Sequence, residues 1–156
     1  MGAQSAGVLV YRFQSGTLQV LLVHPGGPFW AKKDKGAWSI PKGEHTAQED
    51  AFQAARRELQ EETGFEAHGQ AMDLGVLRQP GGKRVHIWAV EGDFDPHEIR
   101  SNTFEMEWPP KSSQVQRFPE VDRAAWFTAS EAKEKLHKGQ LGFIDRLCLQ
   151  LGVHSD

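Results

Sequence analysis

The stretch that decides the fold covers residues 43–65 and reads GEHTAQEDAFQAARRELQEETGF. Its middle part, residues 47–63, is rich in helix-forming residues and contains neither Gly nor Pro, which predicts an α-helix. We expect Thr46 to open this helix, because Glu49 follows it at the spacing of a capping box. Gly64 is a natural residue to end it.

Three glutamates of the predicted helix share one face. Glu58, Glu61 and Glu62 stand at i, i+3 and i+4, so their Cβ atoms lie about 5–6 Å apart. Like charges at this spacing repel, and Arg57, most naturally paired with Glu61, neutralises only one of them. A hard divalent cation with oxygen ligands would neutralise the set, and Mg²⁺ or Mn²⁺ is the natural choice. A solvated acidic face is the alternative and the commoner role of an isolated charge run.

The residues around the glutamates favour the metal site. The stretch follows the pattern G-x5-E-x7-R-E-U-x-E-E-x-G-U, in which U is bulky and apolar. Every fixed position is matched, by Gly43, Glu49, Arg57, Glu58, Leu59, Glu61, Glu62, Gly64 and Phe65. The stretch thereby resembles the Nudix box of the Nudix hydrolase superfamily. The resemblance implies an α/β fold, an α/β/α sandwich with a mixed β-sheet in which the box forms a loop, a helix and a loop. It also implies hydrolysis of a nucleoside diphosphate linked to another moiety.

The resemblance assigns a role to each charged residue of the box. Glu58 and Glu62 are the main ligands of Mg²⁺, with Mn²⁺ as a substitute. Glu61 is a further ligand, and Gly43 contributes its carbonyl oxygen. Arg57 orients the glutamates, so the resemblance places Glu61, Glu62 and Arg57 among the catalytic residues.

A carboxylate outside the box completes the predicted site. Glu120 stands shortly before the apolar run 124–127, an arrangement that resembles the one in diadenosine tetraphosphate hydrolases. The resemblance implies that Glu120 is a metal ligand or the general base. Glu105 and Glu107 are its competitors, because their loop is able to close over the site.

The residues before the box suggest a substrate. Residues 38–43 read WSIPKG and resemble an element of the asymmetric diadenosine tetraphosphate and diphosphoinositol polyphosphate hydrolases, which implies that Lys42 binds phosphate. The loop 24–36 carries Lys32 and Trp30, a cation and a ring that suit a polyphosphate and a stacked base. A solvated loop whose aromatic residues anchor in the core is the alternative.

A second substrate class stays open. Pro80 follows the box by 15 residues and begins PGGKR, and a proline near that distance followed by Gly-Gly resembles ADP-ribose pyrophosphatases. A plain hairpin turn is the local alternative. Arg84 ends this run and joins the predicted substrate-binding residues, and Trp108 joins Trp30 as a candidate for base stacking. We expect a dinucleoside polyphosphate such as diadenosine tetraphosphate, with ADP-ribose or another nucleotide sugar, or a non-catalytic nucleotide-binding domain, as alternatives.

The rest of the chain predicts a single domain over residues 1–156. Thr128 and Glu131 have capping-box spacing and predict a second helix, and a last helix covers about 140–151. The segment 106–119 contains three prolines and is expected to be a loop. Apolar and β-branched runs predict strands at 7–13, 17–23, 37–40, 74–79, 83–90 and 124–127.

Composition limits the partners. Eighteen Lys and Arg against 21 Asp and Glu give a net charge of −3, which disfavours duplex nucleic acid. No apolar run is long enough to span a membrane, and residues 1–6 do not resemble a secretory signal. The single cysteine, Cys148, allows no intrachain disulfide and lies in an apolar run typical of a buried thiol. We expect a cytoplasmic monomer or homodimer that binds a small nucleotide or polyphosphate.

Overall fold

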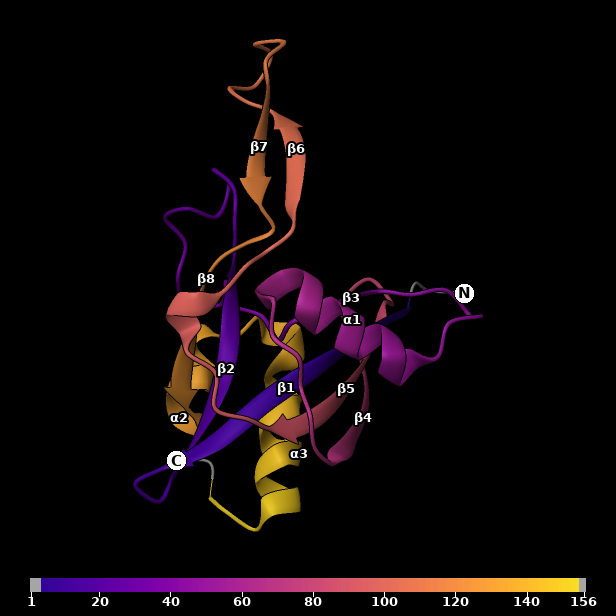
Figure 1. The fold of residues 1–156 in the computed structure, drawn as a ribbon, viewed down its shortest axis with the longest axis vertical. Helices are drawn as coiled ribbons and strands as arrows, with labels where there is room; N and C mark the ends of the chain where they lie inside the picture. The colour runs from indigo at the N-terminus through magenta and orange to yellow at the C-terminus, as the bar shows by residue number, and fades with distance from the viewer. Residues whose placement is uncertain (1–3, 155–156) are drawn as a thin grey trace.

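A mixed six-stranded β-sheet forms the centre of the computed structural model, which describes residues 4–154 (Figure 1). The strand order is β4-β5-β1-β2-β8, and β3 pairs with β1 outside this path. Only β1 and β5 run parallel, and the other pairs of this sheet are antiparallel. The strands are β1 (Gln4–Gln14), β2 (Thr17–Pro25), β3 (Lys42–Glu44), β4 (Ala71–Arg78), β5 (Arg84–Glu91) and β8 (Val121–Thr128).

Helices cover both faces of the sheet. Helix α1 (Ala51–Thr63) packs on one face, and α2 (Ala129–Lys135) and α3 (Leu141–Leu151) pack on the other (Figure 1). Two short 3₁₀ turns, at Pro96–Glu98 and Lys138–Gln140, lie between the larger elements. The arrangement confirms the predicted α/β/α sandwich with a mixed sheet.

Strand β1 explains why the chain begins with an almost continuous apolar run. Successive side chains of a strand point to opposite faces of the sheet. Val8 and Val10 therefore pack with α1, whereas Leu9 and Tyr11 pack with α2 and α3. Because both faces are covered, neither set is polar, and the strand lacks the alternation of a half-exposed sheet.

The sheet opens on one side of β1. Strand β5 occupies one edge of β1, and the other edge pairs with β3 over residues 5–7 and with β2 over residues 11–14. Residues 37–41 fill the gap through isolated bridges at Trp38 and Ser39 and a hydrogen bond from the Val8 amide to the Pro41 carbonyl. The predicted strand 37–40 is therefore wrong, because this segment is shared between neighbours and ladder pairing begins only after Pro41.

Helix α1 begins four residues later than predicted. Asp50 is its N-cap and accepts a hydrogen bond from the Gln53 amide, so the expected cap at Thr46 is wrong. The side chain of Glu49, which a capping box at Thr46 requires, instead binds Arg57. The predicted end is confirmed, since Gly64 adopts a left-handed conformation with φ of 80°.

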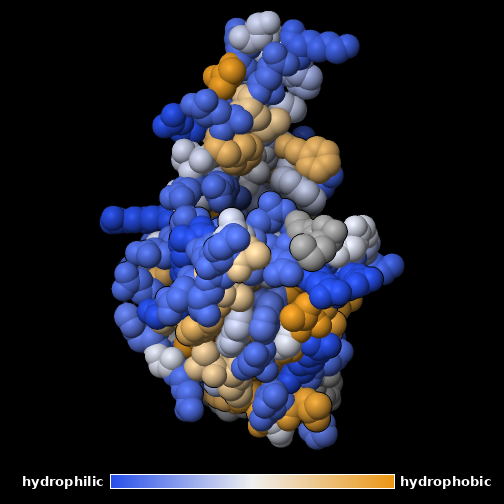
Figure 2. Space-filling view, turned by 90° about the vertical axis from the view of Figure 1, so that its right-hand side faces the viewer, coloured by the Kyte–Doolittle hydropathy of each residue, from blue (hydrophilic) through white to orange (hydrophobic). Residues whose placement is uncertain are grey.

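The segment 106–119 is not a plain loop, which corrects the prediction. Strands β6 (Thr103–Glu107) and β7 (Val115–Pro119) form a separate two-stranded sheet, here named the arm, that projects from the body (Figure 1). Two of the three prolines lie in its turn and the third ends β7, so none interrupts the pairing. Apolar residues lie among hydrophilic ones on the arm, and further apolar patches lie on the body (Figure 2).

Most of the remaining elements agree with the sequence. The hairpin β4–β5, the strands β1, β2 and β8, and the capping box at Thr128 and Glu131 are confirmed. Cys148 is buried, as expected. Within residues 4–154 no helix is both long and apolar enough to cross a membrane. The first three residues, on which part of the expectation about a signal rests, lie outside the described range, and the cytoplasmic location and oligomeric state stay predictions.

Replacing Leu59 by Ala should destabilise the protein strongly. Leu59 is 0% exposed and holds α1 against the sheet, so its truncation leaves a cavity. We expect a loss of about 2–5 kcal/mol in the free energy of unfolding, measured by urea titration. Leu149→Ala is the matched control, because Leu149 is 84% exposed and should cost little. Similar losses in both variants would contradict the packing described here.

Candidate active site

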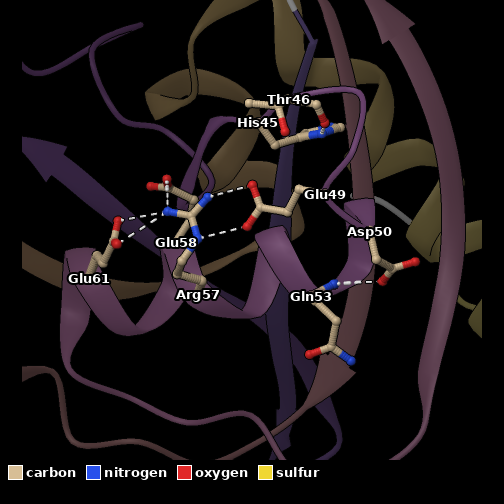
Figure 3. Close-up of polar contacts among 8 residues, drawn as sticks. All are labelled: His45, Thr46, Glu49, Asp50, Gln53, Arg57, Glu58 and Glu61. Atoms are coloured by element: carbon tan, nitrogen blue, oxygen red, sulfur yellow. Dashed lines mark hydrogen bonds and ion pairs between the residues drawn. The ribbon is translucent and has the colours of Figure 1, made fainter.

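One guanidinium group organises the acidic face of α1 (Figure 3). Arg57 donates from Nε and Nη2 to the two carboxylate oxygens of Glu49, at 3.0 and 3.1 Å. Its Nη1 donates to Glu58 at 3.0 Å and to Glu61 at 3.2 Å. Arg57 thus connects the loop before the helix to two glutamates within it, the geometry expected of an orienting residue.

The backbone of β3 lies directly against Glu58. A Cβ atom placed on Gly43 would overlap the carboxyl atoms of Glu58, so only glycine leaves room for this side chain. Glu58 is 9% exposed, and burial raises the pKa of its carboxyl, with the negative charge of Glu61 adding to the effect. Two predicted metal ligands, the carbonyl oxygen of Gly43 in β3 and the carboxylate of Glu58 in α1, therefore lie on adjoining segments.

Glu62 of α1 interacts with Lys42, the first residue of β3. The pKa of Glu62 is raised to about 8, mainly by burial and also by the charge of Glu58 and that of Glu120, whereas Lys42 opposes the rise through its charge and a backbone hydrogen bond. Burial also lowers the pKa of Lys42, and the charge of Lys83 adds to that decrease. The site therefore holds more negative charge than Lys42 and Arg57 neutralise.

Backbone hydrogen bonds bring Glu120 to the box. The last turn of α1 has carbonyl groups without helical partners, and the Asn102 amide donates to one of them, that of Glu61. The Asn102 carbonyl in turn accepts from the Glu120 amide at 2.8 Å. Burial and then the charge of Glu61 raise the pKa of Glu120, which is consistent with a position beside the cluster.

The two competitors of Glu120 are occupied within the arm. Glu105 pairs with Arg117 at 3.0 Å, and both side chains are well exposed. Glu107 accepts hydrogen bonds from the amides of Lys111 and Ser113 in the turn of the arm. These contacts favour Glu120 over either of them as the additional carboxylate.

The donor set suits a hard divalent ion in its chemistry. Carboxylates and a backbone carbonyl are the ligands that Mg²⁺ and Mn²⁺ prefer. Burial, and secondarily the neighbouring negative charges, raises the pKa values of Glu58, Glu62 and Glu120. Among residues 4–154, no group of three or more His, Cys, Asp or Glu has the geometry of a metal site. In this structure Arg57 hydrogen-bonds Glu58 and Glu61, and Lys42 interacts with Glu62.

Two cavities share Trp30 and Pro25 in their walls. One of about 310 Å³ is lined by Lys42 and Lys83, together with Pro25, Trp30, Ala37, Ser39, Gln79, Pro80, His137 and Gln140. The other, of about 340 Å³, reaches Glu120 and is mainly apolar, with Pro25, Gly26, Gly27, Phe29, Trp30, Phe104 and Met106 in its wall. The first cavity suits phosphate, and the second suits a flat apolar group.

The loop that carries Trp30 is held in place at its base. His24 is 0% exposed and hydrogen-bonds Asp122 at 2.9 Å and the carbonyl of Lys33 at 2.6 Å. A side chain at Gly26 would overlap the Pro119 carbonyl, so the loop packs tightly against the end of β7. Lys33 lies 5.0 Å from the centre of the Trp30 ring system.

Several residues named from the sequence lie away from these cavities. Lys32 is exposed and Trp108 is half-buried, and neither lines these cavities. Arg84 lines a different cleft. The sequence analysis missed Phe104 and Met106, because the arm was expected to be a loop, and Lys83, which carries no motif of its own.

Comparison with known proteins identifies the family. A model of the NUDIX domain matches residues 1–147. The chain belongs to the Nudix family. The family expected from the box is therefore confirmed. The family match does not distinguish one Nudix branch from another.

Individual Nudix proteins resemble the chain at low identity. The 8-oxo-(d)GTP phosphatase of Mycolicibacterium smegmatis is 32% identical over 105 residues, 64% of this chain, which spans only 26% of that protein. The NUDIX domain of Shewanella oneidensis NrtR, complexed with ADP ribose, has a TM-score of 0.67 at 16% identity and covers 97% and 89% of the two chains. A C. elegans Ap4A hydrolase has a TM-score of 0.61 at 21% identity, covering 96% and 98%. The structural matches show the fold alone.

The stability of the metal-free protein should fall as pH rises. The folded pKa of Glu62 is about 8, above its ordinary value of 4.5. Such a carboxyl stabilises the fold fully below its unfolded pKa and loses this contribution as pH rises through the folded value. In EDTA, we expect the urea midpoint to decline between about pH 5 and 9, and Glu62→Gln to remove much of the decline. Glu66→Gln changes an exposed carboxyl and should leave the decline as it is in the parent protein. An unchanged decline in Glu62→Gln would contradict the assignment of the raised pKa to Glu62.

Proposed function

We propose that the chain is a Mg²⁺-dependent Nudix pyrophosphohydrolase that cleaves a phosphoanhydride bond in a dinucleoside polyphosphate such as diadenosine tetraphosphate. The observation that carries this proposal is the convergence of four glutamates and Lys42 beside two cavities that share Trp30 in their walls. Cleavage requires both the anion and the metal to be held, and this arrangement supplies groups for each.

Glu58, Glu61 and Glu62 and the carbonyl of Gly43 would hold the divalent ion, and Glu120 would be a further ligand or the general base. When bound, Mg²⁺ or Mn²⁺ supplies positive charge that offsets both the carboxylates and the phosphates and makes a nearby water more acidic. Arg57 keeps Glu58 and Glu61 on one side of the helix and does not need to touch substrate. A bound cation would therefore offset the repulsion among these carboxylates.

Glu120 and Lys42 act on opposite partners of the reaction. Glu120 has a raised pKa and borders the apolar cavity, so it is suited to accept the proton of the attacking water. Lys42 borders the other cavity and donates to phosphate oxygens as a point charge. Water adds to one phosphorus, the bridging P–O bond breaks, and the leaving phosphate takes the electron pair.

The two cavities support a substrate with a group at each end of a phosphate chain. The apolar cavity has the rings of Phe29, Trp30 and Phe104 for one base. The cavity with Lys42 and Lys83 accommodates phosphates and the second nucleoside. The C. elegans Ap4A hydrolase, by its name, acts on such a molecule, and its fold is similar to that of this chain.

ADP-ribose or another nucleotide sugar is the second candidate. Pro80, the residue that resembles the proline of ADP-ribose pyrophosphatases, lines the cavity with Lys42. The NrtR domain similar in fold was complexed with ADP ribose. A purely nucleotide-binding role is disfavoured by the complete set of box glutamates, and product analysis separates the three.

A panel of substrates with Mg²⁺ or Mn²⁺, read by product mass, tests the function. We expect diadenosine tetraphosphate to give ATP and AMP, whereas ADP-ribose would give AMP and ribose phosphate. Glu62→Gln should lose activity by more than the roughly 10–100-fold typical of residues that only support a metal ligand. Glu66→Gln is the control with the same chemical change at an exposed position.

The same assay separates the proposed roles of the glutamates. Glu120→Gln should lower the rate by about 10²–10⁴-fold, as for loss of a general base, while calorimetry still detects Mg²⁺ binding. A parental pH–rate profile in that variant would exclude Glu120 as the base. If no phosphoanhydride is cleaved with either metal, the proposed activity fails, and the alternative of a nucleotide-binding domain gains support.

Replacing Trp30 by Ala should weaken binding of the substrate. Loss of a base–aromatic stack costs about 1–3 kcal/mol, so we expect KM for diadenosine tetraphosphate to rise about tenfold, with a smaller change in kcat. Trp108→Ala is the control, since Trp108 lines neither cavity. An equal effect of both changes, or a larger effect of Trp108→Ala, would contradict the assignment of Trp30.

A further inference from the structure

A separate cleft of about 300 Å³ opens on the α1 face of the sheet. Gln4, Arg84 and Arg78 occupy neighbouring positions on β1, β5 and β4, so three polar side chains form a row across the strands. His86 stands two residues after Arg84 and therefore on the same face. The remaining wall comes from His45 and from the start of α1 at Ala51, together with Ser5 and Val76.

The row carries positive charge with no acid to balance it. Arg78 and Arg84 are directly opposite each other in the antiparallel pair, a placement at which like charges destabilise a sheet. Among the ion pairs and hydrogen bonds of residues 4–154, neither arginine side chain has a partner. Two exposed arginines that repel each other form a site to which an anion can bind.

The acids on the neighbouring strands and loop are engaged elsewhere. Asp73 of β4 hydrogen-bonds His86 at 2.6 Å, and Glu44 of β3 pairs with Lys83 at 3.2 Å. Asp50 caps α1 by accepting from the Gln53 amide. None of these carboxylates is paired with the arginine row.

Further groups of the cleft favour a phosphorylated ligand that also has a flat part. The α1 N-terminus borders the cleft at Ala51; its dipole favours anions, and the Asp50 carboxylate already binds its Gln53 amide. The imidazole of His86 stacks on Trp88, with ring centres 3.8 Å apart, and Phe52 packs against Trp88 at 5.3 Å. Because Asp73 engages Nε2 of His86, the guanidinium groups and the Gln4 amide are the donors of the cleft, and His86 joins its wall to the aromatic stack.

The cleft is distinct from the site next to the box glutamates. Gln79 and Lys83, the neighbours of the two arginines along the β4–β5 hairpin, line the cavity that contains Lys42. Arg78 and Arg84 line the cleft and are not in the wall of that cavity. Adjacent residues of a hairpin point to opposite faces, so the hairpin separates the two cavities.

We propose that this cleft is a second anion site, which binds the phosphate of a nucleotide without a metal ion. Arg78 and Arg84 donate to the phosphate oxygens, and the guanidinium geometry suits two hydrogen bonds to one phosphate. His86 and Gln4 border the rest of the ligand. The site does not depend on hydrolysis and needs no divalent cation.

Calorimetry in EDTA tests the site, with AMP and inorganic pyrophosphate as separate probes. The absence of divalent ions suppresses metal-assisted binding at the glutamates and leaves the arginine cleft able to bind. We expect the double variant Arg78→Gln, Arg84→Gln to weaken binding of AMP by tenfold or more. A control double variant, Arg100→Gln, Arg117→Gln, removes the same charge from other exposed positions and should bind as the parent does.

A third variant, Lys42→Gln, distinguishes this site from the proposed active site. If binding in EDTA survives Lys42→Gln and disappears in the arginine double variant, the second site stands, whatever the outcome of the hydrolysis assay. If binding is lost with Lys42→Gln and kept without the arginines, the proposal is wrong. Equal losses in both double variants would show a general charge effect and would also overturn it, and absence of parental binding would do the same.

Discussion

The placement of the glutamates depends on one guanidinium, that of Arg57. It binds Glu49 with two hydrogen bonds and also reaches Glu58 and Glu61, so it fixes the loop before α1 relative to the helix itself. Without this group, the helix carries clustered carboxylates that repel each other and a loop with no anchor on them. The close packing of Gly43 on Glu58 requires the same loop position, which the pairing of β3 with β1 also fixes.

The box and its helix were predictable because their information is local. The i, i+3, i+4 spacing places the carboxylates on one face in any helix, and Gly64 ends the helix through its own backbone freedom. The start was not predictable from local spacing, because two motifs compete for Glu49. A capping box uses it as the partner of Thr46, but Arg57, eight residues along the chain, binds it in the fold, and Asp50 then caps the helix.

The position of Glu120 was expected only by resemblance, and its physical cause is not local. Its amide binds the Asn102 carbonyl, and the Asn102 amide binds the last turn of α1, so a carboxylate 58 residues after Glu62 reaches the cluster through backbone groups. Because every residue type has these backbone groups, such contacts cannot be predicted from a pattern of side chains. The arm escaped prediction for a related reason, because its prolines suggest a loop and only the pairing of β6 with β7 shows that they lie at the turn and the end.

At the C-terminal end of helix α1 the charge has the unfavourable sign; Asp50 caps the N-terminal end, but the arginines of two neighbouring strands lie beside that end. Acids are favoured at the N-terminus of a helix and cations at the C-terminus, each by about 0.3–1 kcal/mol. Here the last turn contains Glu61 and Glu62 and no basic residue, and the arginine row lies beside the first turn. This distribution of charge does not stabilise the helix itself. The distribution is explained if each end has a ligand of opposite charge: a divalent cation at the glutamates and, as we propose, a phosphate at the arginines. Both ligands then restore the electrostatic balance that the isolated fold lacks.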